Sequence, residues 1–134
     1  EGTTYIAGPY THPDNAVREL RYQILSQVSL YFMNNDQDVF SPITHGHAME
    51  VAGVGPNKPD YKTWILHGLK HLQKCDRMYV CDIPGTDDSS GVDMEIRWCI
   101  MNGIPYQFLD EDMIQKMDTV DNDILTRLEE LDLK

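Results

Sequence analysis

The segment RMYVCDIPGTDDSSGVDMEIRWCIM, residues 77–101, contains a β-prone run, a polar turn and a helical stretch in direct succession. The β-prone run covers residues 77–81, and Pro84-Gly85 within the polar residues 82–90 is a strong breaker of regular structure. From Gly91 to about Met101, apolar residues recur at three- and four-residue steps, which is the helical period. The segment therefore predicts a strand followed by a polar loop and then a helix.

The same alternation extends over the rest of the chain. Residues 41–60, rich in Gly, Pro and His, are expected to form one long irregular loop. Alternating strands and helices are typical of a parallel sheet with helices on both faces, so we predict an α/β fold, a flavodoxin-like or Rossmann-like three-layer sandwich with four or five strands. Strands are expected at residues 3–7, 38–40, 77–81 and 105–109, helices at 13–34, 61–75 and 91–101, and an acidic, weakly helical segment at 110–134.

Composition narrows the choice of partners and compartment. The 134 residues fit a single domain, residues 1–134, and the formal net charge of −11 argues against nucleic acid polymers and anionic membranes. A small anionic substrate is still compatible with this charge, because one pocket can be locally positive. The sequence shows neither a signal peptide nor an apolar run long enough to span a bilayer. The three cysteines lack metal or disulfide spacing, which favours reduced thiols and a cytoplasmic protein.

Parallel sheets of this kind bind ligands outside the carboxyl ends of their strands. That rule selects residues 8–10, 41–60, 82–90 and the turn after Leu109. At the start of the helix after residue 90, hydroxyl groups and free backbone N–H groups can receive an anion. Glu95 lies beside the apolar face of the same helix, where it is either a favourable partner of the helix dipole or a functional carboxylate.

Four short motifs stand at these places: Tyr5-Ile-Ala-Gly-Pro-Tyr10, Phe40-Ser-Pro-Ile-Thr-His45, Cys75-Asp76, and Pro84-Gly85 followed by Asp88-Ser89-x-Gly91-Val92-x-x-Glu95. Together they resemble the nucleoside 2-deoxyribosyltransferase-like superfamily, over roughly residues 3–109. Within it, the chain is similar to a small bacterial and phage branch and to deoxynucleoside 5′-monophosphate N-glycosidases. The resemblance implies a flavodoxin-like fold and chemistry at an N-glycosidic bond.

The resemblance also implies a mechanism. The carboxylate of Glu95 attacks the anomeric carbon, the base leaves, and water or a second base resolves the covalent sugar-enzyme. Tyr5 donates a hydrogen bond that keeps Glu95 ionised. Ser89 stands where nucleoside transferases have Asp and nucleoside 5′-monophosphate hydrolases have Ser, which favours a nucleotide as substrate. Asp87 and Asp88 argue against a nucleotide, unless their side chains point away or bind sugar hydroxyls. The implied substrate-binding residues are Gly8, Pro9, Tyr10, His45, Asp88, Ser89, Ser90 and Gly91.

One position departs from the resemblance. Many relatives have an Asp eight residues before the Asp of the Cys-Asp pair, and this chain has Gly68 there. His67 is adjacent but is turned about 100° away around the helix. His45 and His47 are open to three interpretations: substrate contact, metal chelation, or a loop pair without a function. Arg18 and Arg21 either reach a phosphate or cover the surface and pair with carboxylates.

Three functions follow from these features. The first is an N-glycosidase or deoxyribosyltransferase that uses Glu95 and needs neither a metal nor an organic cofactor, because the carboxylate itself supplies the nucleophile. The second, motivated by Gly68, is a catalytically silent protein that binds a nucleotide or a nucleotide-derived signal. The third is an oligomeric scaffold. The resemblance implies a homo-oligomer, and the apolar residues within 121–131 either serve that assembly or pack on their own sheet.

Overall fold

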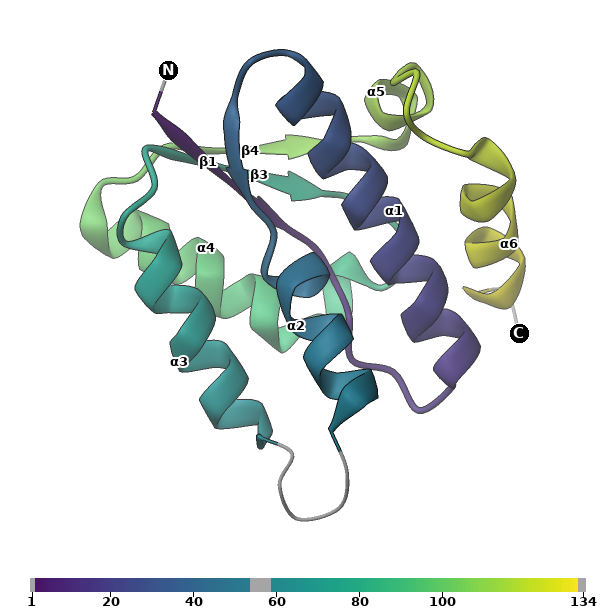
Figure 1. Cartoon of the computed structure of the whole chain (residues 1–134), viewed down its shortest axis with the longest axis horizontal. Helices are drawn as coiled ribbons and strands as arrows, with labels where there is room; N and C mark the ends of the chain where they lie inside the picture. Colours follow the sequence, from purple (N-terminus) through teal and green to yellow (C-terminus); the bar gives the residue numbers. More distant parts are fainter. Residues whose placement is uncertain (1, 54–58, 133–134) are drawn as a thin grey trace.

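The computed structural model describes residues 2–53 and 59–132. Its strands form a four-stranded sheet in the order β2-β1-β3-β4, and all the pairings are parallel (Figure 1). Helices cover both faces, so the predicted three-layer α/β sandwich is confirmed. The elements are β1 (Thr3–Ala7), α1 (Asn15–Asn34), β2 (Asp38–Phe40), α2 (Pro42–Ala52), α3 (Tyr61–Leu72), β3 (Arg77–Cys81), a 3-10 turn (Thr86–Asp88), α4 (Ser90–Asn102), β4 (Tyr106–Leu109), α5 (Glu111–Gln115) and α6 (Asn122–Asp132).

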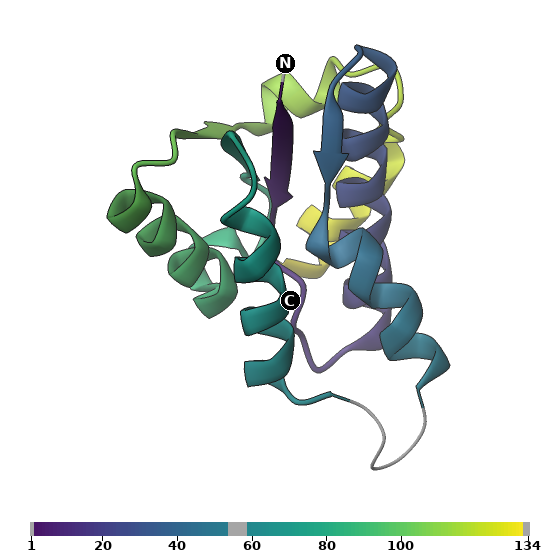
Figure 2. The same ribbon diagram turned by 60° about the vertical axis from the view of Figure 1, so that its left-hand side comes forward.

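The two faces of the sheet bury different side chains of β1, because successive residues of a strand point to opposite sides. Ile6 packs with the buried residues of α1, α5 and α6. Tyr5 and Ala7 pack with those of α3 and α4 on the other face. Figure 2 shows these two helical layers on either side of the strands. The side chain of Tyr5 is therefore directed toward α3 and α4.

Short polar side chains fix where several helices begin. Asp14, Asp60, Ser89 and Asp110 each accept a hydrogen bond from a backbone N–H in the first turn of the following helix, which satisfies a donor that lacks a partner within the helix. With Asp60 as its cap, α3 begins at residue 61, where the sequence predicted a helix to start. The first helix starts two residues later than expected, because Asp14 acts as its cap rather than as a helical residue.

Helix α2 corrects the prediction of one long loop over residues 41–60. Ser41 caps it by accepting a hydrogen bond from the Thr44 N–H, and Pro42 occupies the first turn, where a missing N–H costs nothing. Packing stabilises this helix despite its central glycine: a Cβ at Gly46 would lie 3.1 Å from the Trp64 ring of α3. The local sequence concealed α2 because its stability comes from its neighbours. Residues 54–58 of the expected loop lie outside the described residues.

The acidic C-terminal segment forms α5 and α6. Ile124, Leu125 and Leu128 of α6 are buried in the same core cluster as the apolar residues of α1. Of the two roles left open for this stripe, packing on its own fold is the one that the structure shows.

Helix α1 buries residues that recur at three- and four-residue steps along one side. Its buried residues are Val17, Leu20, Arg21, Ile24, Leu25, Val28 and Phe32. Within residues 2–53 and 59–132, none of the helices combines the length and the apolar character needed to cross a membrane.

Arg21 is the unexpected member of this buried set. Its guanidinium donates hydrogen bonds to the carbonyl oxygens of Thr11 (3.0 Å), Pro84 (3.3 Å) and Tyr10 (3.4 Å). It therefore ties the loop after β1 to the loop after β3, at the edge of the sheet where ligands are expected. Arg18 likewise donates to the carbonyl oxygen of His12. Both arginines bind backbone carbonyl groups, an arrangement that neither interpretation of them included.

Substitution at Gly85 tests this tie. Gly85 has a φ of +102°, and a Cβ there would overlap the Arg21 guanidinium. We expect Gly85→Ala to lower the free energy of unfolding by roughly 2–4 kcal/mol, combining left-handed strain with displacement of Arg21. Urea denaturation measures the change.

The matched control is Gly103→Ala. Gly103 also has a positive φ, +68°, but a Cβ there would have nothing within 4 Å. Its cost should be about 1–2 kcal/mol, that of backbone strain alone. Equal losses at the two positions would contradict a role for the Arg21 contact.

Candidate functional site

A buried hydrogen bond joins the side chains of Tyr5 and Glu95. The Tyr5 hydroxyl donates a hydrogen bond to Oε2 of Glu95, and the two residues are 0% and 8% exposed. Tyr5 lies on β1, between β2 and β3, at the point where the order of the strands reverses. Glu95 comes from α4, which follows β3. Parallel sheets bind ligands outside the carboxyl ends of their strands at such a switch point. The two residues predicted as catalytic contact each other beside this point, on the face of the sheet that α3 and α4 cover.

The position of Glu95 follows from the local sequence of α4. Ser89 caps the helix by accepting a hydrogen bond from the Val92 N–H at 3.2 Å. Val92 and Cys99 are buried against α3 and the sheet. Glu95 lies three residues after the first and four before the second, so helical periodicity places its carboxyl on the same buried side.

Burial dominates the electrostatics of this pair. It raises the pKa of Glu95 to about 7, and the hydrogen bond from Tyr5 opposes that shift. Burial, followed by the charge of Glu95, raises the pKa of Tyr5 well above its usual value. Tyr5 is therefore the donor, while Glu95 can gain or lose a proton near neutral pH. A carboxyl with this property can act as a nucleophile, a base or an acid.

Gly68 borders the same pair. A Cβ built at Gly68 of α3 would lie 2.9 Å from the Tyr5 hydroxyl oxygen. The position at which the resemblance expects an Asp thus faces the site, and the hydroxyl of Tyr5 occupies the space next to it. The adjacent His67 contacts His45 instead, with 3.2 Å between the two Nε2 atoms, as expected for a side chain turned away from Tyr5.

The segment after β1 is tightly packed. Gly8 and Pro9 are buried and Tyr10 is half-buried. A Cβ at Gly8 would overlap Leu25, so only glycine lets this turn pass so close to α1.

The start of α4 retains hydrogen-bonding capacity. The Ser89 oxygen accepts from its own helix, but its O–H proton can still be donated outward. The Ser90 hydroxyl lies 2.6 Å from the Tyr61 hydroxyl of α3, close to Gly91. Asp87 and Asp88 are exposed.

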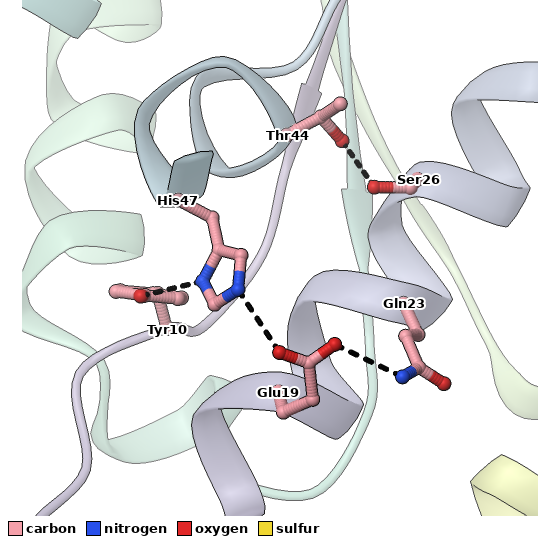
Figure 3. A network of polar contacts seen from close by, with 6 residues as sticks. All are labelled: Tyr10, Glu19, Gln23, Ser26, Thr44 and His47. Atoms are coloured by element: carbon pink, nitrogen blue, oxygen red, sulfur yellow. Dashed lines mark hydrogen bonds and ion pairs between the residues drawn. The ribbon is translucent and has the colours of Figure 1, made fainter. Parts of the chain in front are cut away.

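The two histidines of the Thr44-His45-Gly46-His47 motif lie on a helix, not in a loop, and they point to different sides. His45 is exposed on the α3 side. His47 is buried, with Nδ1 2.8 Å from the Tyr10 hydroxyl oxygen and Nε2 3.1 Å from Oε1 of Glu19 (Figure 3). Sequence reasoning missed Glu19 of α1, because its contact with His47 forms only when residues 42–52 fold as helix α2. In the part of the chain that the structure describes, no three His, Cys, Asp or Glu side chains converge as metal ligands.

Comparison with known proteins places the chain in a family. A family model described as a domain of unknown function, DUF1937, matches residues 2–111. The chain belongs to this family. The DUF1937 match spans both Tyr5 and Glu95, and it ends at the first residue of α5, so α6 lies outside it. No curated protein matches the chain. The family description names no activity, so the likeness to nucleoside 2-deoxyribosyltransferase-like proteins stays a prediction.

The contact between Gly68 and Tyr5 predicts a coupling. We expect Gly68→Ala to lower the free energy of unfolding by about 1–3 kcal/mol, because overpacking beside Tyr5 outweighs the better helix propensity of alanine. In a Tyr5→Phe background the same change should cost less, since the hydroxyl is gone. Urea denaturation of the two single variants and the double variant measures the coupling, and additive losses would contradict it.

The buried carboxyl of Glu95 predicts a pH dependence of stability. Its pKa is about 7 in the folded state against an ordinary value of 4.5, so the folded protein retains this proton to higher pH. The associated stability is present below about pH 4.5 and is lost as the pH rises through about 7. Relative to Glu95→Gln, the wild type should lose up to roughly 3 kcal/mol between these limits.

Urea denaturation of both proteins at about pH 5 and about pH 8 measures this difference. Asp93→Asn is the control, because Asp93 is an exposed carboxylate on the same helix that pairs with Arg97. Its effect should stay within about 1 kcal/mol at either pH. If the difference in free energy of unfolding between the wild type and Glu95→Gln changed as little between the two pH values as it does for Asp93→Asn, the raised pKa of Glu95 would be wrong.

Proposed function

We propose that this protein cleaves the N-glycosidic bond of a nucleoside 5′-monophosphate or nucleoside, with Glu95 as the nucleophile. The observation that supports this most is the buried Tyr5–Glu95 hydrogen bond at the strand-order switch point. The sugar is a deoxyribose in the relatives that the sequence resembles. The covalent intermediate is resolved by water in a hydrolase or by a second base in a transferase.

The chemistry uses the two oxygens of Glu95 differently. Tyr5 donates to Oε2, so we assign Oε1 as the atom that attacks C1′. As that bond forms, the bond from C1′ to the base breaks, and its electron pair leaves with the base, which takes up a proton from solvent water. The transition state resembles an oxocarbenium ion, which a carboxylate in a water-poor site stabilises strongly. Water or a second base then attacks C1′ and restores the carboxylate.

The start of α4 supports a nucleotide over a nucleoside. The Ser89 hydroxyl and the first N–H groups of the helix can donate to a phosphate at the positive end of the helix dipole. Asp87 and Asp88 are exposed, so water and salt screen their repulsion of such a group.

Base release from 2′-deoxynucleosides and their 5′-monophosphates, followed by chromatography, tests the mechanism. Wild-type kcat/KM should rise with pH through about 7, because the attacking form of Glu95 is the ionised one. Glu95→Gln should lose at least ~10³-fold in kcat, as expected for removal of a nucleophile. Tyr5→Phe should shift the pH profile upward, since the hydrogen bond that lowers the pKa of Glu95 is gone.

Asp93→Asn serves as the matched control, since this exposed carboxyl lies on the same helix but outside the site. It should keep wild-type rates. Base release that is the same in Glu95→Gln as in the wild type would rule out the proposed mechanism.

A catalytically silent nucleotide-binding protein is the second candidate. Gly68 favours it, because no side chain at that position can assist the departing base. Tight binding of a nucleotide without turnover would select this function. The absence of any nucleotide-dependent rise in the melting temperature would instead favour an oligomeric scaffold. A homo-oligomer and a cytoplasmic location remain part of the proposal, resting on the resemblance and on the three free cysteines.

A further inference from the structure

A hydrogen-bonded chain of three side chains leads from α1 to the loop after β1. Figure 3 shows the ring of His47 between Tyr10 and Glu19. Its Nδ1 lies 2.8 Å from the Tyr10 hydroxyl oxygen, and its Nε2 lies 3.1 Å from Oε1 of Glu19. Gln23, one turn along α1, donates to the other oxygen of Glu19 at 3.0 Å. The mechanism proposed above uses none of these contacts.

The contacts around a neutral His47 ring set a direction for each hydrogen bond. The hydrogen bonds from Gln23 and His47 hold the pKa of Glu19 below its ordinary value, so this carboxylate is ionised and can only accept. His47 must therefore carry its proton on Nε2. In a neutral imidazole the other nitrogen, Nδ1, then only accepts. With His47 in this neutral form, the Tyr10 hydroxyl donates its single proton to Nδ1, which leaves its oxygen with acceptor capacity alone.

Two ring contacts and a backbone tie hold the His47 ring and the Tyr10 hydroxyl in this orientation. The Tyr22 ring stacks on the His47 ring with centroids 4.0 Å apart, and the Tyr10 ring meets it edge-on at 5.6 Å. Arg21 binds the carbonyl oxygens of Tyr10 and Thr11, which fixes the backbone that carries the tyrosine. The Tyr10 oxygen is thus preorganised and not free to rotate its proton toward a ligand.

We propose that Tyr10 is a specificity-determining residue whose oxygen accepts a hydrogen bond from an N–H or O–H group of the substrate, and that His47 and Glu19 are positioning residues that keep this oxygen an acceptor. The inference rests on the proposed function for the identity of the substrate. Tyr10 follows β1, the strand that carries Tyr5, and it is half-buried at the ligand edge of the sheet. A site built in this way rejects analogues that lack the donor.

The first test needs no substrate. Nitrogen-15 NMR of the imidazole groups, assigned with a His47→Gln variant, reports which nitrogen of His47 carries the proton at neutral pH. We expect the proton on Nε2 in the wild type and a mixture of both forms in Glu19→Ala. A proton on Nδ1 in the wild type, alone or together with one on Nε2, would overturn the proposal whatever the protein does to nucleotides.

The second test compares three probes. They are 2′-deoxyadenosine 5′-monophosphate, the purine analogue that lacks its 6-amino group, and the 2′,3′-dideoxy analogue that lacks its 3′-hydroxyl. The wild type should show a KM at least ~10-fold higher for one analogue than for the parent, because that analogue leaves the Tyr10 oxygen unpaired. Tyr10→Phe should erase this difference, mainly through KM, and Glu19→Ala should reduce it.

Ser26→Ala is the matched control. The Ser26 and Thr44 hydroxyl oxygens lie 2.7 Å apart and join the same two helices, α1 and α2, as the Glu19–His47 contact does (Figure 3). If the hydrogen bonds of Tyr10, His47 and Glu19 merely docked α2 onto α1, removing the Ser26 hydroxyl would have a similar effect on the KM difference. We expect the difference to remain in Ser26→Ala.

The outcomes separate this inference from the proposed function. A KM difference that persists in Tyr10→Phe, that vanishes equally in Ser26→Ala, or that is absent from the wild type overturns the role of Tyr10 while base release still stands. If none of the three probes is bound or cleaved by the wild type, the proposed function fails and the substrate role of Tyr10 fails with it. The NMR result would then still report the His47 tautomer independently.

Discussion

A carboxyl group buried between a helix and a sheet needs a hydrogen-bond partner, and Tyr5 supplies it to Glu95. This contact sets the position of α4 relative to β1. It also requires glycine at position 68, because a larger residue would press on the Tyr5 hydroxyl. The carboxyl of Glu95 and its hydrogen-bond donor are therefore built into the core of the fold, where burial itself raises the pKa of Glu95 to about 7. The predicted pH dependence of stability and the proposed chemistry both rest on this one desolvated group.

Helix α2 organises the other half of the site. On one side its Gly46 packs against Trp64 of α3, and on the other its His47 contacts Glu19 of α1. It therefore lies between the two helices, and it brings an imidazole to the Tyr10 hydroxyl. Arg21 completes this arrangement by tying the loops that follow β1 and β3. The polar edge of the sheet is thus held by side chains from α1 and α2, while the buried carboxyl of Glu95 comes from α4.

Several elements were predictable because their signals are local. The apolar stripe of α1, the cap at Asp60 and the alternation that leads to a parallel sheet each depend on residues close together in the sequence. The burial of Glu95 also follows from its spacing to Val92 and Cys99 on one helix. Helix α2 was not predictable in this way, because a helix with a central glycine and no clear apolar stripe is stabilised by its neighbours.

The sequence by itself determined the alternation of strands and helices, apart from α2, and the parallel α/β architecture that follows from it, because periodicity, capping and breaker residues act over a few positions. Only the tertiary structure decided that Gly68 makes room for the Tyr5 hydroxyl, that a buried Arg21 binds backbone carbonyls, and that Glu19 meets His47. These contacts join segments from different elements. Their energies depend on burial and on the distance between groups, which the positions of residues along the chain do not specify.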